Sequence, residues 1–326
     1  MAGFVLQRLA QAVIVVFAMS IIVFVGVYAI GNPIDVLIDP GADQATRAAL
    51  IAQYGLDQPL WRQYANFLGG VATGDLGRSL IYNVPVVELI FSRLPATLEL
   101  VLVSVAIATG LGVPLGLYAG YRPDAAPAKA IMAFSVLGFS VPTFWIGMLL
   151  IMTFAVELGV LPSGGRGAVG SFLGIPTSLV TADGWSHVIL PAINLSLFNM
   201  GLMIRLTRAG MVEAMGADYV RFARAQGLSE GRIVRSHVLK NISIPLVTVF
   251  GLELGSTLAF AVVTESVFNW PGVGKLIIDS ILQLDRPVMV AYLVLVVILF
   301  VLINFTVDLV YARLDPRVRL GGGAGE

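Results

Sequence analysis

The sequence of 326 residues has no cysteine and only two histidines. Without cysteine the chain can form no disulfide and offers no thiolate to a metal ion or a substrate. The histidines, His187 and His237, are far apart in the sequence, and neither has the neighbouring ligands of a metal site. We therefore expect neither thiol chemistry nor a metal site in this chain.

Charged residues are also scarce. They make up 12% of the sequence, against about 25% in an ordinary soluble domain. Hydrophobic residues make up 57%, and the mean hydropathy is +0.89. This composition predicts an all-α integral membrane protein, and the formal net charge of zero gives no reason to expect a nucleic-acid partner. The sequence also lacks the glycine-rich loop with adjoining Lys and Ser or Thr that holds nucleotide phosphates, so we do not expect the chain to hydrolyse ATP by that route.

Six apolar runs are long enough to be candidate transmembrane helices. Thirteen of the 20 Lys and Arg residues fall in segments that this arrangement places on one side, which predicts that both termini are cytoplasmic. The expected spans are residues 11–32, 100–121, 130–156, 188–204, 241–264 and 287–307.

The same pattern divides the chain into four parts. Residues 1–32 form a cytoplasmic head and the first span, and residues 33–97 form an extracytoplasmic segment. Residues 98–310 form a five-helix core that includes a cytoplasmic loop at residues 205–241. Residues 311–326 form a cytoplasmic tail.

The cytoplasmic loop is the most informative part of the sequence. Seven of the 20 Lys and Arg residues lie between Arg205 and Pro245. Asp218 is suited to cap a short helix over residues 219–226, Gly227 to end that helix in a left-handed conformation, and Ser229 to cap the next helix. The spacing therefore predicts a helix, a glycine turn and a second helix.

The first of these helices has two faces. Tyr219, Phe222 and Ala223 share an apolar face, and Arg221 and Arg224 share another. A helix of this length is marginal alone in water, so we expect another protein to receive the apolar face. The alternative is a basic loop that lies on lipid headgroups.

The order ARAQGLSEGRIVRSHVLKNISIP, with Ala223, Gly227 and Pro245, resembles the EAA loop of ABC-importer permeases, and more closely the dipeptide, oligopeptide and nickel importers. Arg221 and Phe222 replace the first two letters of the motif, and the longer distance from Gly227 to Pro245 favours the peptide branch. The resemblance implies a coupling helix that sits in a cleft of an ATPase subunit. The residues it assigns to this coupling loop are Asp218, Tyr219, Arg221, Phe222, Ala223, Arg224, Gly227, Leu228, Ser229 and Glu230.

Three other stretches resemble the same permeases. TGDLGRSL begins at Thr73, RLPATLEL begins at Arg93 where the second span starts, and FNWPGVGKLIIDSILQLDRP precedes the last span. The glycines around Asp75 predict tight turns.

Five residues are candidates for the translocation path. Pro142 removes a helix hydrogen bond, so we expect a break in the helix near Ser140. This break either lines the path or only shapes the packing between helices. Asn194 and Asn199 need partners inside a span, and they either join helices or face the path. Glu253 costs about 3 kcal/mol to insert, so it should face protein or water, either in the path or in a contact needed for assembly.

The resemblance implies a permease subunit that is not itself an enzyme. The implied partners are a second, similar permease, two ATPase subunits that bind ATP and Mg, an extracytoplasmic solute-binding protein and the lipid of a bacterial cytoplasmic (inner) membrane. Peptides are the expected substrates, and nickel complexes, glutathione or another small solute are the alternatives. A secondary transporter and a membrane scaffold without transport activity are the competing classes.

Overall fold

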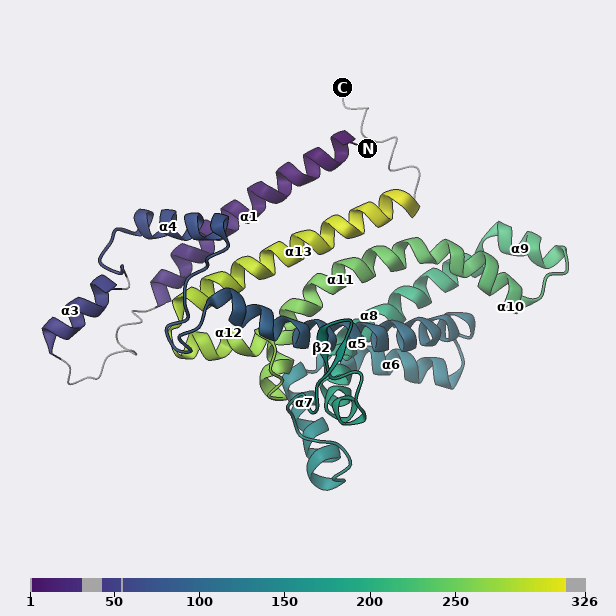
Figure 1. Cartoon of the computed structure of the whole chain (residues 1–326). Coiled ribbons are helices and arrows are strands. Elements are labelled where there is room, and N and C mark those ends of the chain that lie inside the picture. The colour runs from purple at the N-terminus through teal and green to yellow at the C-terminus, as the bar shows by residue number, and fades with distance from the viewer. Residues whose placement is uncertain (1, 31–42, 54, 315–326) are drawn as a thin grey trace. The chain divides into compact units, whose positions relative to one another are not determined.

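The computed structural model describes residues 2–30, 43–53 and 55–314, and these are mainly helical (Figure 1). The chain divides into two units. The first consists of Met1–Thr97 and Pro271–Val301, and the second of Leu98–Trp270 and Leu302–Glu326. The predicted tail at residues 311–326 lies mostly outside the described residues.

The first unit is built from the N-terminal part of the sequence and a segment before its C-terminal end. It contains the beginning of α5 and most of α13, whose remaining residues belong to the second unit. Its helices are α1 (Ala2–Ile30), α3 (Gln44–Gln53), α4 (Leu60–Thr73), α5 (Val86–Tyr121), α12 (Val273–Leu282) and α13 (Arg286–Leu314).

The second unit is also helical, with two π-helical segments and one hairpin. Its elements are the rest of α5, α6 (Ala126–Ser140), α7 (Thr143–Leu150), η1 (Ile151–Glu157), β1 (Gly170–Phe172), β2 (Ile175–Thr177), α8 (Ala182–Gly216), α9 (Asp218–Ala225), α10 (Glu230–Ile233), η2 (Val234–Val238) and α11 (Leu239–Val267).

Four helices of the described chain are long and apolar enough to cross a membrane, namely α5, α8, α11 and α13. The expected third span is not one straight helix, because α6 and the α7–η1 helix meet at an angle of 108°. This pair counts as a fifth span if it crosses once. In α1, the apolar stretch found is Val13–Val27.

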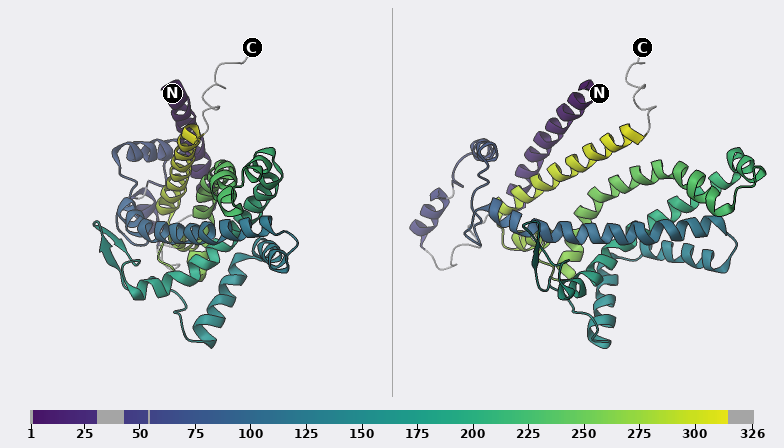
Figure 2. Two further views of the ribbon diagram at one scale, coloured as in Figure 1. Left: turned by 90° about the vertical axis from the view of Figure 1, so that its right-hand side faces the viewer. Right: turned by 45° about the vertical axis from the view of Figure 1, so that its right-hand side comes forward.

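Helix α8 is the central helix of the second unit, and 67% of its most apolar window is buried. Figures 1 and 2 show α11 following α8 toward α9. Helix α5 packs closely against α8 at Gly112, Gly116 and Gly120, three glycines of α5 that recur every fourth residue. A Cβ atom at Gly116 would lie 2.6 Å from the Cβ of Thr207, so a larger residue would force the two helices apart. This small-residue stripe is a common way to pack helices in lipid.

The hairpin is the exception to the expected all-α fold. β1 pairs antiparallel with β2. Both turn residues have positive φ, +52° at Leu173 and +81° at Gly174, as a tight two-residue hairpin turn requires. The hairpin occupies part of the segment that the sequence predicted to be a loop.

A buried carboxylate holds this segment to α5. Glu99 accepts a hydrogen bond from Arg166 at 2.7 Å, from the Ser178 hydroxyl and from the Ser178 backbone N–H at 3.2 Å. The side chain of Glu99 is almost fully buried, and so is most of the Arg166 side chain. The charge is therefore paired and hydrogen-bonded, as a buried charge must be.

The first unit contains a similar contact. Asp285, which is fully buried, accepts hydrogen bonds from the Ser79 hydroxyl at 2.5 Å and the Leu80 backbone N–H at 3.1 Å. Close by in the sequence, Gly74 and Gly77 have φ of +77° and +81°, which confirms the predicted tight turns. The stretches TGDLGRSL and QLDRP, more than 200 residues apart, are thus joined by one side chain.

Candidate functional site

The segment formed by α9 and α10 has the predicted helix, glycine turn and helix. Gly227 has φ +79°. Its N–H donates to the carbonyl of Arg224 at 2.9 Å, and the N–H of Leu228 donates to the carbonyl of Ala223 at 3.2 Å. This pair of bonds is the Schellman arrangement, in which a left-handed residue closes a helix.

The start of each helix differs from the expectation. Ala217 occupies the N-cap position of α9, and Asp218 is the first helical residue, so the prediction that Asp218 caps this helix is wrong. Its carboxylate instead lies 3.4 Å from Arg221, in a first turn where negative charge is favourable. Ser229 does occupy the N-cap position of α10, but its hydroxyl caps no backbone N–H in the described chain.

The apolar residues of α9 do not all point the same way. Val220 and Ala223 are buried against α8, η2 and α11, in a cluster that includes Met211, Ile233 and Val238. The assignment of Ala223 to an outward apolar face is therefore wrong. The chain itself receives this side of α9, and the reason is the i, i+3 spacing of Val220 and Ala223, which forms a second apolar stripe.

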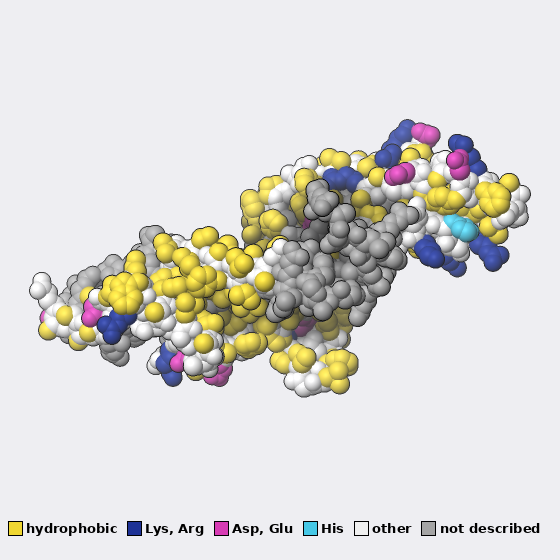
Figure 3. All heavy atoms as spheres, turned by 90° about the horizontal axis from the view of Figure 1, so that it is seen from above, with side chains coloured by type: hydrophobic (Ala, Val, Ile, Leu, Met, Phe, Trp, Pro, Cys, Tyr) yellow, Lys and Arg dark blue, Asp and Glu magenta, His cyan; other side chains and the backbone are white. Residues whose placement is uncertain are grey.

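The outward face of α9 consists of Tyr219 and Phe222. Their side chains are 38% and 66% exposed. Charged side chains gather at the end of the molecule that carries α9 and α10 (Figure 3). An exposed aromatic pair within a charged rim is a typical docking surface for another protein.

One ion pair crosses the glycine turn. Arg224 donates to both carboxylate oxygens of Glu230, at 2.7 and 3.2 Å. This hydrogen-bonded pairing lowers the pKa of Glu230 and raises the pKa of Arg224. The ion pair contributes to stability at pH values above the usual pKa of a glutamate. This contribution is lost as the pH falls through the lowered pKa of Glu230. Because both groups are exposed, the pair contributes little to stability and mainly fixes the turn.

The turn leads directly into the membrane helix α11. η2 follows α10 without a break, and Val238, Ile242 and Leu246 continue the cluster that buries Val220. The described structure also extends α8 to Gly216, beyond the expected end of the fourth span. The loop expected at residues 205–241 is thus largely helical, and α9 packs on the ends of both α8 and α11.

The predicted helix break is present. α6 ends at Ser140, Val141 is extended, and Pro142 precedes α7. The Pro142 carbonyl accepts from the N–H groups of Trp145 and Ile146, which begins the new helix. Ser140 is exposed at this break, and its role in the path stays a prediction.

Asn194 and Asn199 both bond across helices. Asn194 donates to Thr264 at 3.1 Å and Asn199 donates to Thr257 at 2.6 Å, so each amide joins α8 to α11. A cavity of about 100 Å³ lies beside them and is lined by Asn199 and Thr257. The amide nitrogens therefore have the partners expected of residues that join helices, and the role of Asn194 and Asn199 in a path stays a prediction.

Glu253 is half-buried on α11. Its carboxylate accepts a hydrogen bond from Ser256 at 2.9 Å, one turn along the same helix. This contact accounts for one lone pair of a costly intramembrane carboxylate. Because Ser256 is on the same helix, the role of Glu253, in the path or in assembly, stays a prediction.

The structure also brings together residues that sequence reasoning missed. Glu99, Arg166 and Asp285 are buried charged groups whose partners lie 67 to 206 positions away. The composition offered one signal, since Glu99 lies directly before an apolar run. Within the described chain, no three His, Cys, Asp or Glu side chains group so as to hold a metal ion.

Several long apolar helices, two of them joined by a charged and partly helical connection, define the class, a multi-pass membrane protein. The chain belongs to the family of the binding-protein-dependent transport system inner membrane component, whose model matches residues 112–320. The N-terminal model of the same systems matches residues 1–101. The chain is therefore an ABC-importer permease subunit.

Curated relatives align over almost the whole chain. The dipeptide transport system permease protein DppB of Escherichia coli K12 is 36% identical, and the oligopeptide transport system permease protein AppB of Bacillus subtilis is 38% identical. The glutathione transport system permease protein GsiC of Escherichia coli K12 is also 38% identical. Each alignment covers 98% of this chain and 99% of the relative.

A solved structure of the MetNI methionine ABC transporter has the same fold. Its TM-score is 0.55 at 22% identity, and the match covers 70% of this chain and 96% of the solved one. At this identity the match supports the fold alone.

Proposed function

We propose that this chain forms half of a translocation pathway for peptides in a bacterial inner-membrane importer. A second, similar permease would form the other half, two ATPase subunits would bind ATP and Mg, and a solute-binding protein would deliver the peptide. The near full-length similarity to dipeptide and oligopeptide permeases supports this substrate class. Glutathione is the second candidate, because a permease named for it is equally similar.

The observation that carries the proposal is the two-sided helix α9. Its inner side, Val220 and Ala223, packs on the ends of α8 and α11, while Tyr219 and Phe222 are exposed. If an ATPase displaced the outer side of α9, the packed cluster would transmit this movement to both α8 and α11, without a flexible connection. In this mechanism the ATPases carry out the chemistry, and the permease converts their closure into alternating access.

The proposed topology has six spans with both termini in the cytoplasm. α1 and the bent α6–α7 pair then each cross the membrane once, in addition to the four long helices. This arrangement places α9 and the basic residues around it on the cytoplasmic side, where ATPases are found. Residues 33–97 and the β1–β2 hairpin lie on the opposite side, where a binding protein would dock.

The test uses the complete complex reconstituted with its ATPases and binding protein. Phe222→Ala should release the ATPase subunits during purification and abolish uptake of a labelled dipeptide, because it removes the main exposed apolar contact of α9. Phe172→Ala is the matched control, since this aromatic residue of β1 is 61% exposed in the same unit. It should keep both ATPases bound.

Two results would contradict the proposal. If Phe222→Ala retained the ATPases as wild type does, α9 would not be the docking element. If uptake proceeded without ATPase subunits and followed a proton gradient, the chain would be a secondary transporter. Competition of the labelled dipeptide by excess glutathione would favour the second substrate.

A further inference from the structure

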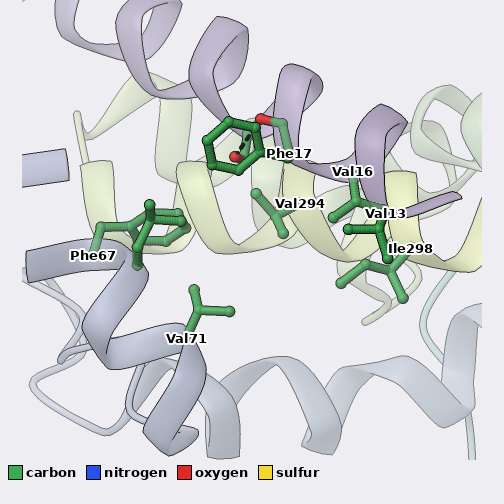
Figure 4. Close-up of a pocket in the computed structure, with 9 residues that line it drawn as sticks. Val13, Val16, Phe17, Phe67, Val71, Val294 and Ile298 are labelled. Atoms are coloured by element: carbon green, nitrogen blue, oxygen red, sulfur yellow. Dashed lines mark hydrogen bonds between the residues drawn. The ribbon is translucent and has the colours of Figure 1, made fainter. Parts of the chain in front are cut away.

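The first unit contains an apolar groove between α1, α4 and α13. Figure 4 shows Val13, Val16, Val294, Ile298 and Val71 pointing into it. Its volume is about 430 Å³, and its surface is almost wholly apolar. The polar side chain in its lining is Ser20, whose hydroxyl bonds to the Phe17 carbonyl at 2.7 Å and to the Tyr64 hydroxyl at 2.8 Å. Because this one hydroxyl is already hydrogen-bonded, the groove offers fewer partners than a buried water molecule needs.

A second cavity of about 510 Å³ adjoins the first, and Phe67 lines both. Its surface is more polar than that of the groove, and we call it the polar cavity. Arg78 and Arg286 lie in its wall together with Asp75, Gln63 and Asn66. The side chain of Arg78 is exposed, and one of its guanidinium nitrogens donates a hydrogen bond to the Asn83 carbonyl at 2.8 Å. Guanidinium groups in pairs are well suited to bind a phosphate.

The two cavities follow one side of α13. Arg286 and Val290 line the polar cavity, and Val294 and Ile298 line the apolar groove, each four residues after the last. At 1.5 Å per residue, Ile298 lies about 18 Å along the helix from Arg286. One leaflet of a bilayer has a hydrocarbon thickness of about 15 Å. The distance from the polar cavity to the end of the groove therefore matches one lipid molecule.

From this arrangement we infer that the two cavities form a binding site for one glycerophospholipid. An acyl chain occupies the groove between α1, α4 and α13, and the phosphate lies at Arg78 and Arg286. Because α13 is among the helices that can cross a membrane, hydrocarbon is the medium beside the groove. The lipid holds α4 against the α1–α13 pair, and so fixes the segment that joins the first two spans.

A helix of the second permease is the competing occupant, and the charge at the end of the groove favours a lipid over it. A phosphate can pair with the guanidinium groups of Arg78 and Arg286, whereas an apolar membrane helix brings no anion to them.

The test is native mass spectrometry of the assembled complex, purified from membranes containing phosphatidylethanolamine and phosphatidylglycerol. Wild type should retain one phospholipid per chain after delipidation. Val294→Trp fills the groove and should lower this occupancy about tenfold, the effect of displacing about two methylenes. Leu302→Trp, on α13 at a side chain 54% exposed, is the matched control and should retain the lipid. Arg78→Gln alters an exposed headgroup contact without touching the groove, and it should also lower occupancy.

A photo-crosslinker at position 294 separates the two occupants. A phospholipid adduct supports the site, and a cross-link to the second permease overturns it. The inference also fails if Val294→Trp and Arg78→Gln both retain the wild-type amount of phospholipid. These outcomes do not depend on the transported substrate, so they stand apart from the test of the proposed function.

Discussion

Gly227 offers the sharpest test of the α9–α10 segment, because its backbone conformation, and no packing contact, favours a glycine there. With φ at +79° and nothing within 4 Å of a Cβ built on it, a side chain there would meet no steric clash with neighbours. A substitution therefore adds backbone strain and nothing else. An L-residue in the left-handed region costs about 1–2 kcal/mol, and a β-branched residue lies at or above the upper end.

This strain can be compared with what the turn contributes. Two backbone hydrogen bonds close α9, from Gly227 to Arg224 and from Leu228 to Ala223, and such bonds contribute about 1 kcal/mol each. Alanine at position 227 should therefore weaken the turn but keep it. The backbone strain of a valine should cancel the stabilisation from both hydrogen bonds, so the end of α9 next to the turn should fray.

Gly227→Val should thus insert at a near-normal level, lose dipeptide uptake, and bind its ATPases weakly or let them hydrolyse ATP without transport. Gly227→Ala should show an intermediate defect. Gly216→Val is the matched control, because this nearby glycine also has open space around it but an ordinary φ. The assay is uptake and ATPase activity of the reconstituted complex. Normal coupled transport by Gly227→Val would show that this turn does not position the coupling element.

Three further predictions follow from the topology and from α11. In this cysteine-free chain, a cysteine at Thr73 should react with an impermeant thiol reagent in intact cells and one at Ser229 should not; labelling at Ser229 would overturn the six-span arrangement. Glu253→Gln should alter uptake or substrate preference with normal assembly if the carboxylate lines the path, or lower the yield of complex if it serves assembly; normal uptake of several substrates with normal yield would exclude both. Single and double alanine variants at Asn199 and Thr257 should give a coupling energy of about 0.6 kcal/mol in thermal melts, the average for such bonds in membranes, and additive effects would mean that their hydrogen bond contributes nothing.

Local features of the sequence predicted local structure well. The left-handed Gly227, the break at Pro142 and the turns around Asp75 each depend on the backbone preferences of one or two residues. The same reasoning failed for Asp218, because Ala217 is extended and takes the N-cap position in its place. Cap positions shift by one residue at little cost, so spacing alone does not fix them.

Features that depend on packing were out of reach. The face of α9 that carries Ala223 could not be assigned without knowing that Val220 points the same way into the cluster on α8 and α11. The Gly112, Gly116 and Gly120 stripe is visible in the sequence, but the helix it packs against is not. Buried pairs such as Glu99 with Arg166 arise from the fold, and no local pattern marks them.

The contact between Asp285 and Ser79 has a consequence for biosynthesis. The two residues are 206 positions apart, so the segment around Ser79 leaves the ribosome long before its partner is made. At about 5–20 residues per second, the delay is roughly 10–40 s. During this interval the first unit has only its N-terminal part and cannot close. We expect its early helices to need shelter by the insertion machinery, and truncations before Asp285 to be degraded even when their spans are inserted.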